Sequence, residues 1–242
     1  MSTTTTTATT TTTTELGAGL SGRALLRLFQ LSSAALPIGA FAYSQGLEQA
    51  VALGDVKCRR TAAAWIGGVL ESSVLRLDVP VFARIYAALA RDEARAVRRW
   101  NDYLFASRGS AELRAEERQV GSALARLLSR EGITAATPWF SDPRVTLATS
   151  FALAGVSWQA PLEQCALSYA YAWIEAQVGA ATRLVPLGQT DAQAVLSEVI
   201  ARAADGIDAA LARSDESLSS STPGQLLLSA LHETQYSRLF RS

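Results

Sequence analysis

The chain has 242 residues, which is enough for one large domain, or at most two, with a full hydrophobic core. Its 22 basic and 22 acidic residues give a net charge of zero, so no overall field favours nucleic acid or an acidic surface. One histidine and two distant cysteines supply no local zinc site, and the position of the single lysine excludes a P-loop. The composition therefore argues against an enzyme, unless that enzyme works through carboxylates alone.

The first part of the chain, residues 1–20, begins with a long run of threonines. It lacks the basic and apolar regions of a secretory signal. Polar low-complexity sequence buries too little surface to offset its chain entropy, so this segment is predicted to be a disordered tail. Without a leader, the two cysteines are expected to be reduced thiols in a cytoplasmic protein.

After the tail, the sequence is rich in Ala, Leu and Arg and poor in β-branched runs, which is typical of helices. Asp78 with Pro80, and Asp142 with Pro143, are predicted to begin new helices, and Thr190 opens a capping box. The expected helices span 23–31, 42–53, 61–77, 80 onward, 92–106, 110–130, 142–156, 161–184, 190–213 and 225 onward. Residues 21–242 are therefore predicted to form one all-α domain, a bundle of about ten helices.

The segment 161–184 is apolar on nearly all sides, because Glu175 is the only charge between Cys165 and Ala181. Such a helix is either a membrane span or the centre of a bundle. Polar side chains interrupt it and no polybasic flank is present, which favours a buried central helix. Residues 214–224 are rich in serine and are predicted to be a mobile linker.

An apolar turn at residues 37–39 separates the first two expected helices. Pro37 fixes φ and Gly39 permits a positive φ, so the backbone there has a specified shape. An apolar turn in a water-soluble protein is expected to be buried or to cover another surface. Phe41, Tyr43 and Glu48 follow the turn, and we predict that they help to form a partner-binding surface.

A cluster of charges, Glu112, Arg114, Glu116, Glu117 and Arg118, occupies about two helical turns. One interpretation is a solvated helix face with (i, i+4) ion pairs, each contributing a few tenths of a kcal/mol. The other is a patch that contacts a partner. The sequence does not decide between them.

The single histidine, His232, stands beside Glu233. Imidazole and carboxylate both suit nickel, so a transient contact with this metal is one interpretation. The simpler interpretation is a histidine at a helix end that is hydrogen-bonded to the backbone.

The last residues include the amphipathic string Tyr236, Arg238, Leu239 and Phe240. Leaving Leu239 and Phe240 in water is unfavourable by roughly 1.5–3 kcal/mol each relative to burial. The string is therefore expected to dock, either on its own domain or on a partner. Tyrosine and arginine are also enriched where binding energy concentrates.

Four segments together resemble the urease accessory protein UreF family, and their order and spacing fit that family. They are residues 30–48, 107–118, 185–189 and 232–242. Ala34 and Ala42 stand where family members often carry Pro or Ser, which are changes between small residues.

The resemblance implies a cytosolic, helical, non-catalytic adaptor. Proteins of this family dimerise, bind the accessory protein UreD (UreH in some organisms) and recruit the GTPase UreG, and the assembly delivers nickel to apo-urease. It implies nickel in transit, no tightly bound cofactor, and no nucleic-acid or membrane partner. The candidate partner-binding residues are Pro37, Gly39, Phe41, Tyr43, Glu48, His232, Glu233, Tyr236, Arg238, Leu239 and Phe240.

Two alternatives remain open from the sequence. A helical enzyme acting through carboxylates would need inward-facing acids such as Glu-x-x-His pairs, and no Glu stands three residues before His232. A GTPase-activating protein would need an arginine finger, and none of the 21 arginines is singled out by its sequence context.

Overall fold

The computed structural model describes residues 20–242, so the predicted tail lies outside the described residues except for Leu20. Within that range the chain forms ten α-helices and no strand, which confirms the all-α fold class. The α-helices are α1 (Gly22–Leu31), α2 (Leu47–Ala52), α3 (Arg59–Val69), α4 (Val79–Ala90), α5 (Ala94–Ala106), α6 (Ala111–Arg130), α7 (Leu147–Ser157), α8 (Leu162–Leu184), α9 (Gln189–Leu211) and α10 (Pro223–His232). The shorter elements are the 3-10 helices η1 (Ala40–Ala42), η3 (Thr134–Trp139) and η4 (Asp215–Ser217) and the π-helix η2 (Leu70–Asp78).

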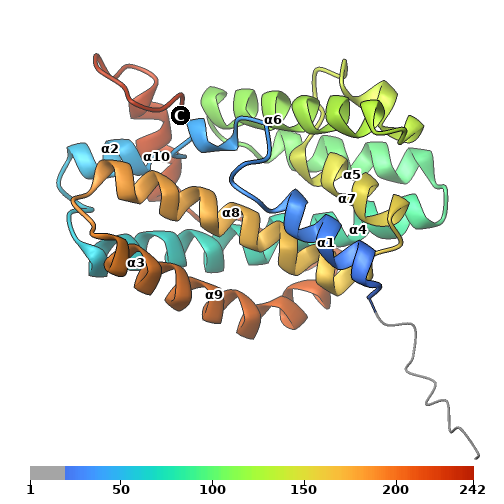
Figure 1. Cartoon of the computed structure of the whole chain (residues 1–242). Helices are drawn as coiled ribbons and strands as arrows, with labels where there is room; N and C mark the ends of the chain where they lie inside the picture. Colours follow the sequence, from blue (N-terminus) through green and yellow to red (C-terminus); the bar gives the residue numbers. More distant parts are fainter. Residues whose placement is uncertain (1–19) are drawn as a thin grey trace, which may run out of the picture.

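Helix α8 lies in the middle of the molecule, where it packs against α1, α3, α4, α7 and α9 (Figure 1). Tyr169 of α8 stacks on Phe82 of α4 with ring centroids 5.2 Å apart, and it meets Phe151 of α7 edge-on. The central burial of this apolar helix agrees with the sequence prediction. None of the helices in residues 20–242 combines the length and apolarity that a membrane crossing requires.

The predicted helix break at Asp78 and Pro80 does not occur. Helices α3, η2 and α4 follow one another without interruption over residues 59–90. Asp78 has helical backbone angles and does not act as a cap. The N–H of Val79 donates to the carbonyl of Val74, five residues earlier, so the helix is π-type just before the proline. This wider turn lets the chain pass through a proline that would interrupt an ordinary α-helix.

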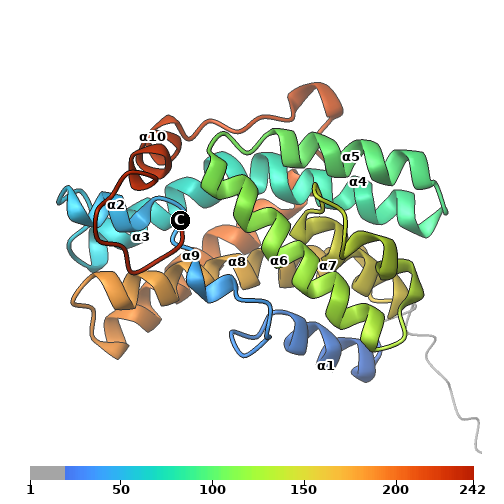
Figure 2. The same ribbon diagram turned by 90° about the horizontal axis from the view of Figure 1, so that it is seen from above.

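The segment 214–224 packs on the π-helix instead of standing free as the predicted linker (Figure 2). The N–H of Ser219 donates to the carbonyl of Arg76 over 3.4 Å. Arg76 lies four residues before Pro80 of α4. The N–H of Ser221 donates to the carbonyl of Ser72 over 3.1 Å. The segment therefore satisfies backbone carbonyls that the irregular helix leaves available.

Three other helix starts differ from the prediction. Residues 42–46 are largely non-helical, and α2 begins only at Leu47. Helix α7 begins after Thr146, whose side chain accepts from the N–H of Thr149, and not at Asp142. The capping box at Thr190 does not form, because α9 begins one residue earlier and has no side-chain cap. Local patterns located these helices but misplaced their first turns.

Candidate functional site

The two segments that hold the predicted partner-binding residues lie side by side. We call residues 233–242, which follow α10, the C-terminal segment. It turns back across the residues before α2 and ends beside α6 (Figure 2). The N–H of Arg241 donates to the carbonyl of Ala42 over 2.8 Å, and the N–H of Ser44 donates to the main-chain oxygen of Ser242 over 2.7 Å. The segment thus docks on its own domain, one of the two outcomes that the sequence predicted.

Glu48 anchors the C-terminal segment. Its carboxylate accepts from the N–H groups of Leu239 and Phe240 over 2.7 and 2.9 Å, and it lies 3.1 Å from Nε2 of His232. The side chain of Glu48 is buried beneath the segment. A buried carboxylate that receives several donors binds the segment through its backbone, so the side chains of Arg238 and Leu239 remain free to face outward.

His232 is fully buried and joins three helices. Its Nδ1 lies 2.9 Å from a carboxylate oxygen of Glu112 on α6, and its Nε2 faces Glu48 on α2. Glu233 points elsewhere, because its carboxylate accepts from the N–H of Ala111 at the start of α6 over 2.9 Å. The structure does not bring His232 and Glu233 together at one exposed point. Their transient contact with nickel stays a prediction.

The other candidate residues divide into exposed and buried groups. Phe41 is 55% exposed and Leu239 is 65% exposed. Pro37, Glu233, Tyr236 and Arg238 are also exposed, and Gly39 has the positive φ of +79° that the turn was predicted to require.

Four predicted partner-binding residues are buried within the fold: Tyr43, Glu48, His232 and Phe240. Their burial corrects the prediction that they themselves form the surface, since in this conformation other parts of the chain cover them. Tyr43 donates to Gln119 over 2.5 Å, and the ring of Phe240 lies 6.0 Å from the guanidinium of Arg183. Tyr43, Glu48 and His232 therefore lie beneath the C-terminal segment, and Phe240 is the side chain of the segment that packs inward.

The three glutamates of the charged cluster on α6 form neither a solvated face nor an exposed patch. Glu112 binds His232 and Arg238, each over 2.9 Å. Glu116 accepts from the side chain of Gln45 over 2.8 Å, and Glu117 accepts from the N–H of Leu147 over 2.8 Å. Both interpretations are therefore wrong for these three side chains, which hold α6 to the rest of the fold.

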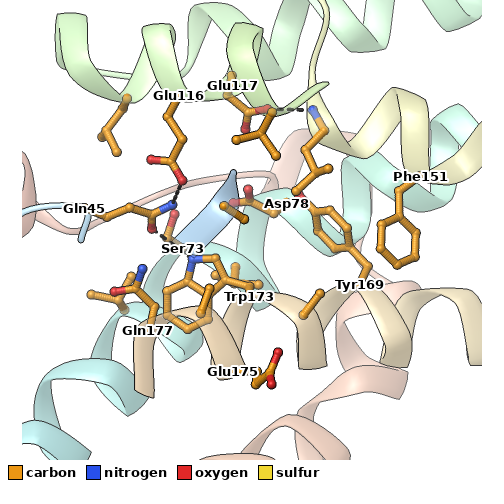
Figure 3. Close-up of a pocket in the computed structure, with 18 of the residues that line it drawn as sticks. Gln45, Ser73, Asp78, Glu116, Glu117, Phe151, Tyr169, Trp173, Glu175 and Gln177 are labelled. Atoms are coloured by element: carbon orange, nitrogen blue, oxygen red, sulfur yellow. Dashed lines mark hydrogen bonds between the residues drawn. The ribbon is translucent and has the colours of Figure 1, made fainter. Parts of the chain in front are cut away.

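A cavity of about 120 Å³ lies beside Gln45 and Glu116, between η2, α6 and α8 (Figure 3). Its wall mixes polar and aromatic side chains, among them Gln45, Ser73, Asp78, Glu116, Glu117, Phe151, Tyr169, Trp173, Glu175 and Gln177. Apolar side chains such as Leu36, Val74, Leu113 and Val120 make up much of the remaining wall, so the polar groups face an otherwise apolar space.

The charges around the cavity are unevenly balanced. Arg108 forms ion pairs with Asp78 and Glu117. The second carboxylate oxygen of Asp78 is buried and has no hydrogen-bond partner. Burial raises the pKa of Glu116 to about 8, so this carboxyl is largely protonated at neutral pH. Among residues 20–242, no group of three or more His, Cys, Asp and Glu side chains is arranged to hold a metal ion.

Sequence reasoning missed several residues of this region. Arg108, Gln45 and Trp173 were not among the predicted site residues, and Asp78 was predicted only as a helix start, although it stands between the apolar residues Leu77 and Val79. A charged residue inside an apolar helical stretch is a signal for a buried ion pair. Gln45 and Trp173 carry no comparable local signal.

Comparisons with known proteins agree with the resemblance of the four segments. A sequence model of the UreF family matches residues 56–200. The chain is 47% identical to the urease accessory protein UreF of Alkalilimnicola ehrlichii, over 91% of this chain and 97% of the relative. It is 44% identical to the UreF proteins of Pseudomonas putida and Citrobacter koseri, over 92% and 91% of this chain and 99% and 98% of the relatives. The chain therefore belongs to the UreF family of urease accessory proteins, whose role is in urease maturation.

Proposed function

We propose that this protein is a cytoplasmic, non-catalytic adaptor that binds UreD (UreH) and recruits the GTPase UreG, so that nickel is delivered into apo-urease. The supporting observation is the arrangement of the C-terminal segment. Its backbone is anchored to the buried Glu48, while Tyr236, Arg238 and Leu239 face outward.

Exposed apolar side chains gather in this region. Phe41 lies just before α2 and Leu239 lies in the C-terminal segment, and both are exposed. On α10, Leu227 is 61% exposed, and Leu231 one turn later is also exposed. Neighbouring exposed apolar residues mark interaction sites in soluble proteins. An exposed tyrosine and an arginine in the same segment add the residue types that concentrate binding energy at interfaces.

A homodimer is part of the proposal, and α1 supports it. Leu26 and Phe29, three residues apart on this helix, are 68% and 61% exposed. The opposite face of α1 buries Ala24, Leu28 and Leu31 against the core. An outward apolar stripe on an otherwise packed helix fits the matching stripe of a second copy.

The transit of nickel is supported by the cavity. Four carboxyl groups line it, those of Asp78, Glu116, Glu117 and Glu175, and the one cation there among residues 20–242, Arg108, pairs with two of them. Oxygen ligands of this kind interact with divalent cations without forming a tight site. Nickel is cargo in this proposal.

The proposal is tested by co-purifying the chain with UreD and UreG and measuring the mass of the complex. Arg238→Ala should weaken the complex more than tenfold, since truncating a buried charged contact at an interface costs about 2–5 kcal/mol. Leu239→Ala should weaken it by about tenfold or more, since burying an exposed leucine contributes about 1.5–3 kcal/mol. The matched control is Ile200→Ala on α9, which lies on the side of the molecule away from the C-terminus (Figure 1). Complexes of normal affinity with both segment variants would contradict the proposal.

The same purified proteins separate an adaptor from an activator. The rate of GTP hydrolysis by UreG is measured with and without the chain, and with and without UreD. Recruitment without a change in hydrolysis supports the adaptor, whereas strong stimulation by the isolated chain supports a GTPase-activating protein.

A further inference from the structure

Gln45 has an unfavourable backbone conformation at the point where the C-terminal segment meets the cavity. Its φ is +54°, in the left-handed region that a residue with a side chain seldom adopts, and Gly46 follows with φ of +86°. Such a conformation persists only where the surrounding contacts hold it. The contacts of Gln45 are therefore informative.

The main chain of Gln45 is held by the C-terminal segment. Its N–H donates to the main-chain oxygen of Ser242 over 3.1 Å, and the N–H of the preceding Ser44 donates to the same oxygen. The hydroxyl of Ser44 also donates to it. The main-chain oxygen of Ser242 thus accepts three hydrogen bonds, two from Ser44 and one from Gln45, where the left-handed turn begins.

The side chain of Gln45 is held by the cavity wall (Figure 3). Its Nε2 donates to Glu116 over 2.8 Å, and its Oε1 accepts from the indole N–H of Trp173 over 2.9 Å. All three side chains line the cavity. The side chain therefore links α6 to α8, and its backbone conformation directs it there.

We propose that Gln45 couples the docking of the C-terminal segment to the link between Glu116 of α6 and Trp173 of α8 in the cavity wall. While the segment is docked, Ser242 holds residues 44 and 45 in the turn that places the Gln45 side chain between Glu116 and Trp173. When the segment leaves, these N–H groups lose their acceptor and Gln45 relaxes to a negative φ. Its side chain then turns away, and Glu116 and Trp173 lose their shared partner. The coupling is reciprocal, as linkage requires.

The first test removes residues 236–242 and follows the indole N–H of Trp173 by NMR, assigned with Trp173→Phe. Its exchange with solvent should become at least about tenfold faster, because its acceptor turns away. Tyr236→Ala is the matched control, since that side chain is fully exposed and the segment stays docked. The backbone amides of α7 should keep their exchange rates.

The second test works from the opposite direction. Gln45→Gly suits the positive φ and deletes the linking side chain. It should speed the exchange of the Trp173 indole as much as the truncation does, and the truncation should add nothing further. Trp173→Phe should in turn speed the exchange of the Ser44 and Gln45 amides, whereas Trp158→Phe should not.

Two results would overturn the coupling. One is a Trp173 indole that exchanges within about twofold of the full chain after truncation. The other is an equal acceleration of the α7 amides, which would mean that the truncation loosens the whole fold. Both measurements use the chain without any partner, so their outcome is independent of the proposed adaptor role.

Discussion

Replacing Glu48 by alanine should release the C-terminal segment. The substitution removes the acceptor of the Leu239 and Phe240 N–H groups and one of the two carboxylates that face His232. Hydrogen bonds to a charged group contribute about 1.5–3 kcal/mol each. Removing one partner of a buried charged network typically costs about 3–5 kcal/mol, and the side chain of Glu48 is only 8% exposed, so solvent screens it little.

The loss in the free energy of unfolding is therefore expected to be about 3–5 kcal/mol. At about 2–4 °C per kcal/mol for a chain of this size, the melting temperature should fall by about 6–20 °C. Glu48→Gln keeps the shape and one acceptor oxygen, so its effect should be smaller. Thermal melts followed by circular dichroism measure the change, and hydrogen exchange at the Leu239 and Phe240 amides shows whether the segment has left.

The control is Glu198→Ala, which removes an exposed ion pair with Arg202 on α9 and should cost less than about 1 kcal/mol. A Glu48→Ala protein that melts within about 2 °C of the unmodified chain, with Leu239 and Phe240 still protected, would refute the reasoning. Glu48 would then be one contact among many and not the anchor.

Three further predictions concern pH, packing and the surface. Burial raises the pKa of Glu116 from 4.5 to about 8, so the folded chain keeps a proton that the unfolded chain releases, and the stability should fall as the pH rises across this interval. Glu116→Gln should therefore raise the melting temperature at about pH 8 but not at about pH 4, and equal shifts at both would contradict this. A Cβ at Gly121 would lie 2.7 Å from the backbone of Thr146, so Gly121→Ala should lower the free energy of unfolding by about 1–3 kcal/mol, measured by urea unfolding. Gly179→Ala is the control, because its Cβ would meet open space, and it should be neutral or stabilising. The side chain of Arg238 is 40% exposed, so Arg238→Ala should cost at most about 1 kcal/mol of stability in the same assay, and a loss of several kcal/mol would place this residue in the core network.

The sequence by itself determined the elements whose causes are local. The predicted helices 110–130 and 161–184 agree with α6 and α8 within one residue, because Ser110 caps the first and Pro161 precedes the second. Helix propensity, capping and apolar periodicity act between residues at most four apart. The family could also be identified from short segments, since their residues occur in a fixed order along the chain.

Only the tertiary structure decided which residues of those segments face outward. Glu48 and Leu239 lie 191 positions apart, and no local rule indicates that one is the anchor of the other. Likewise, the pattern of glutamates on α6 indicates a charged surface, but Gln45, α7, α10 and the C-terminal segment pack on these side chains. The passage of Pro80 through a continuous helix depends on the π turn before it, beside a serine-rich segment that packs on the same helix. The contacts of these positions come from parts of the chain far away in sequence, so local patterns do not reveal whether their side chains are buried or exposed.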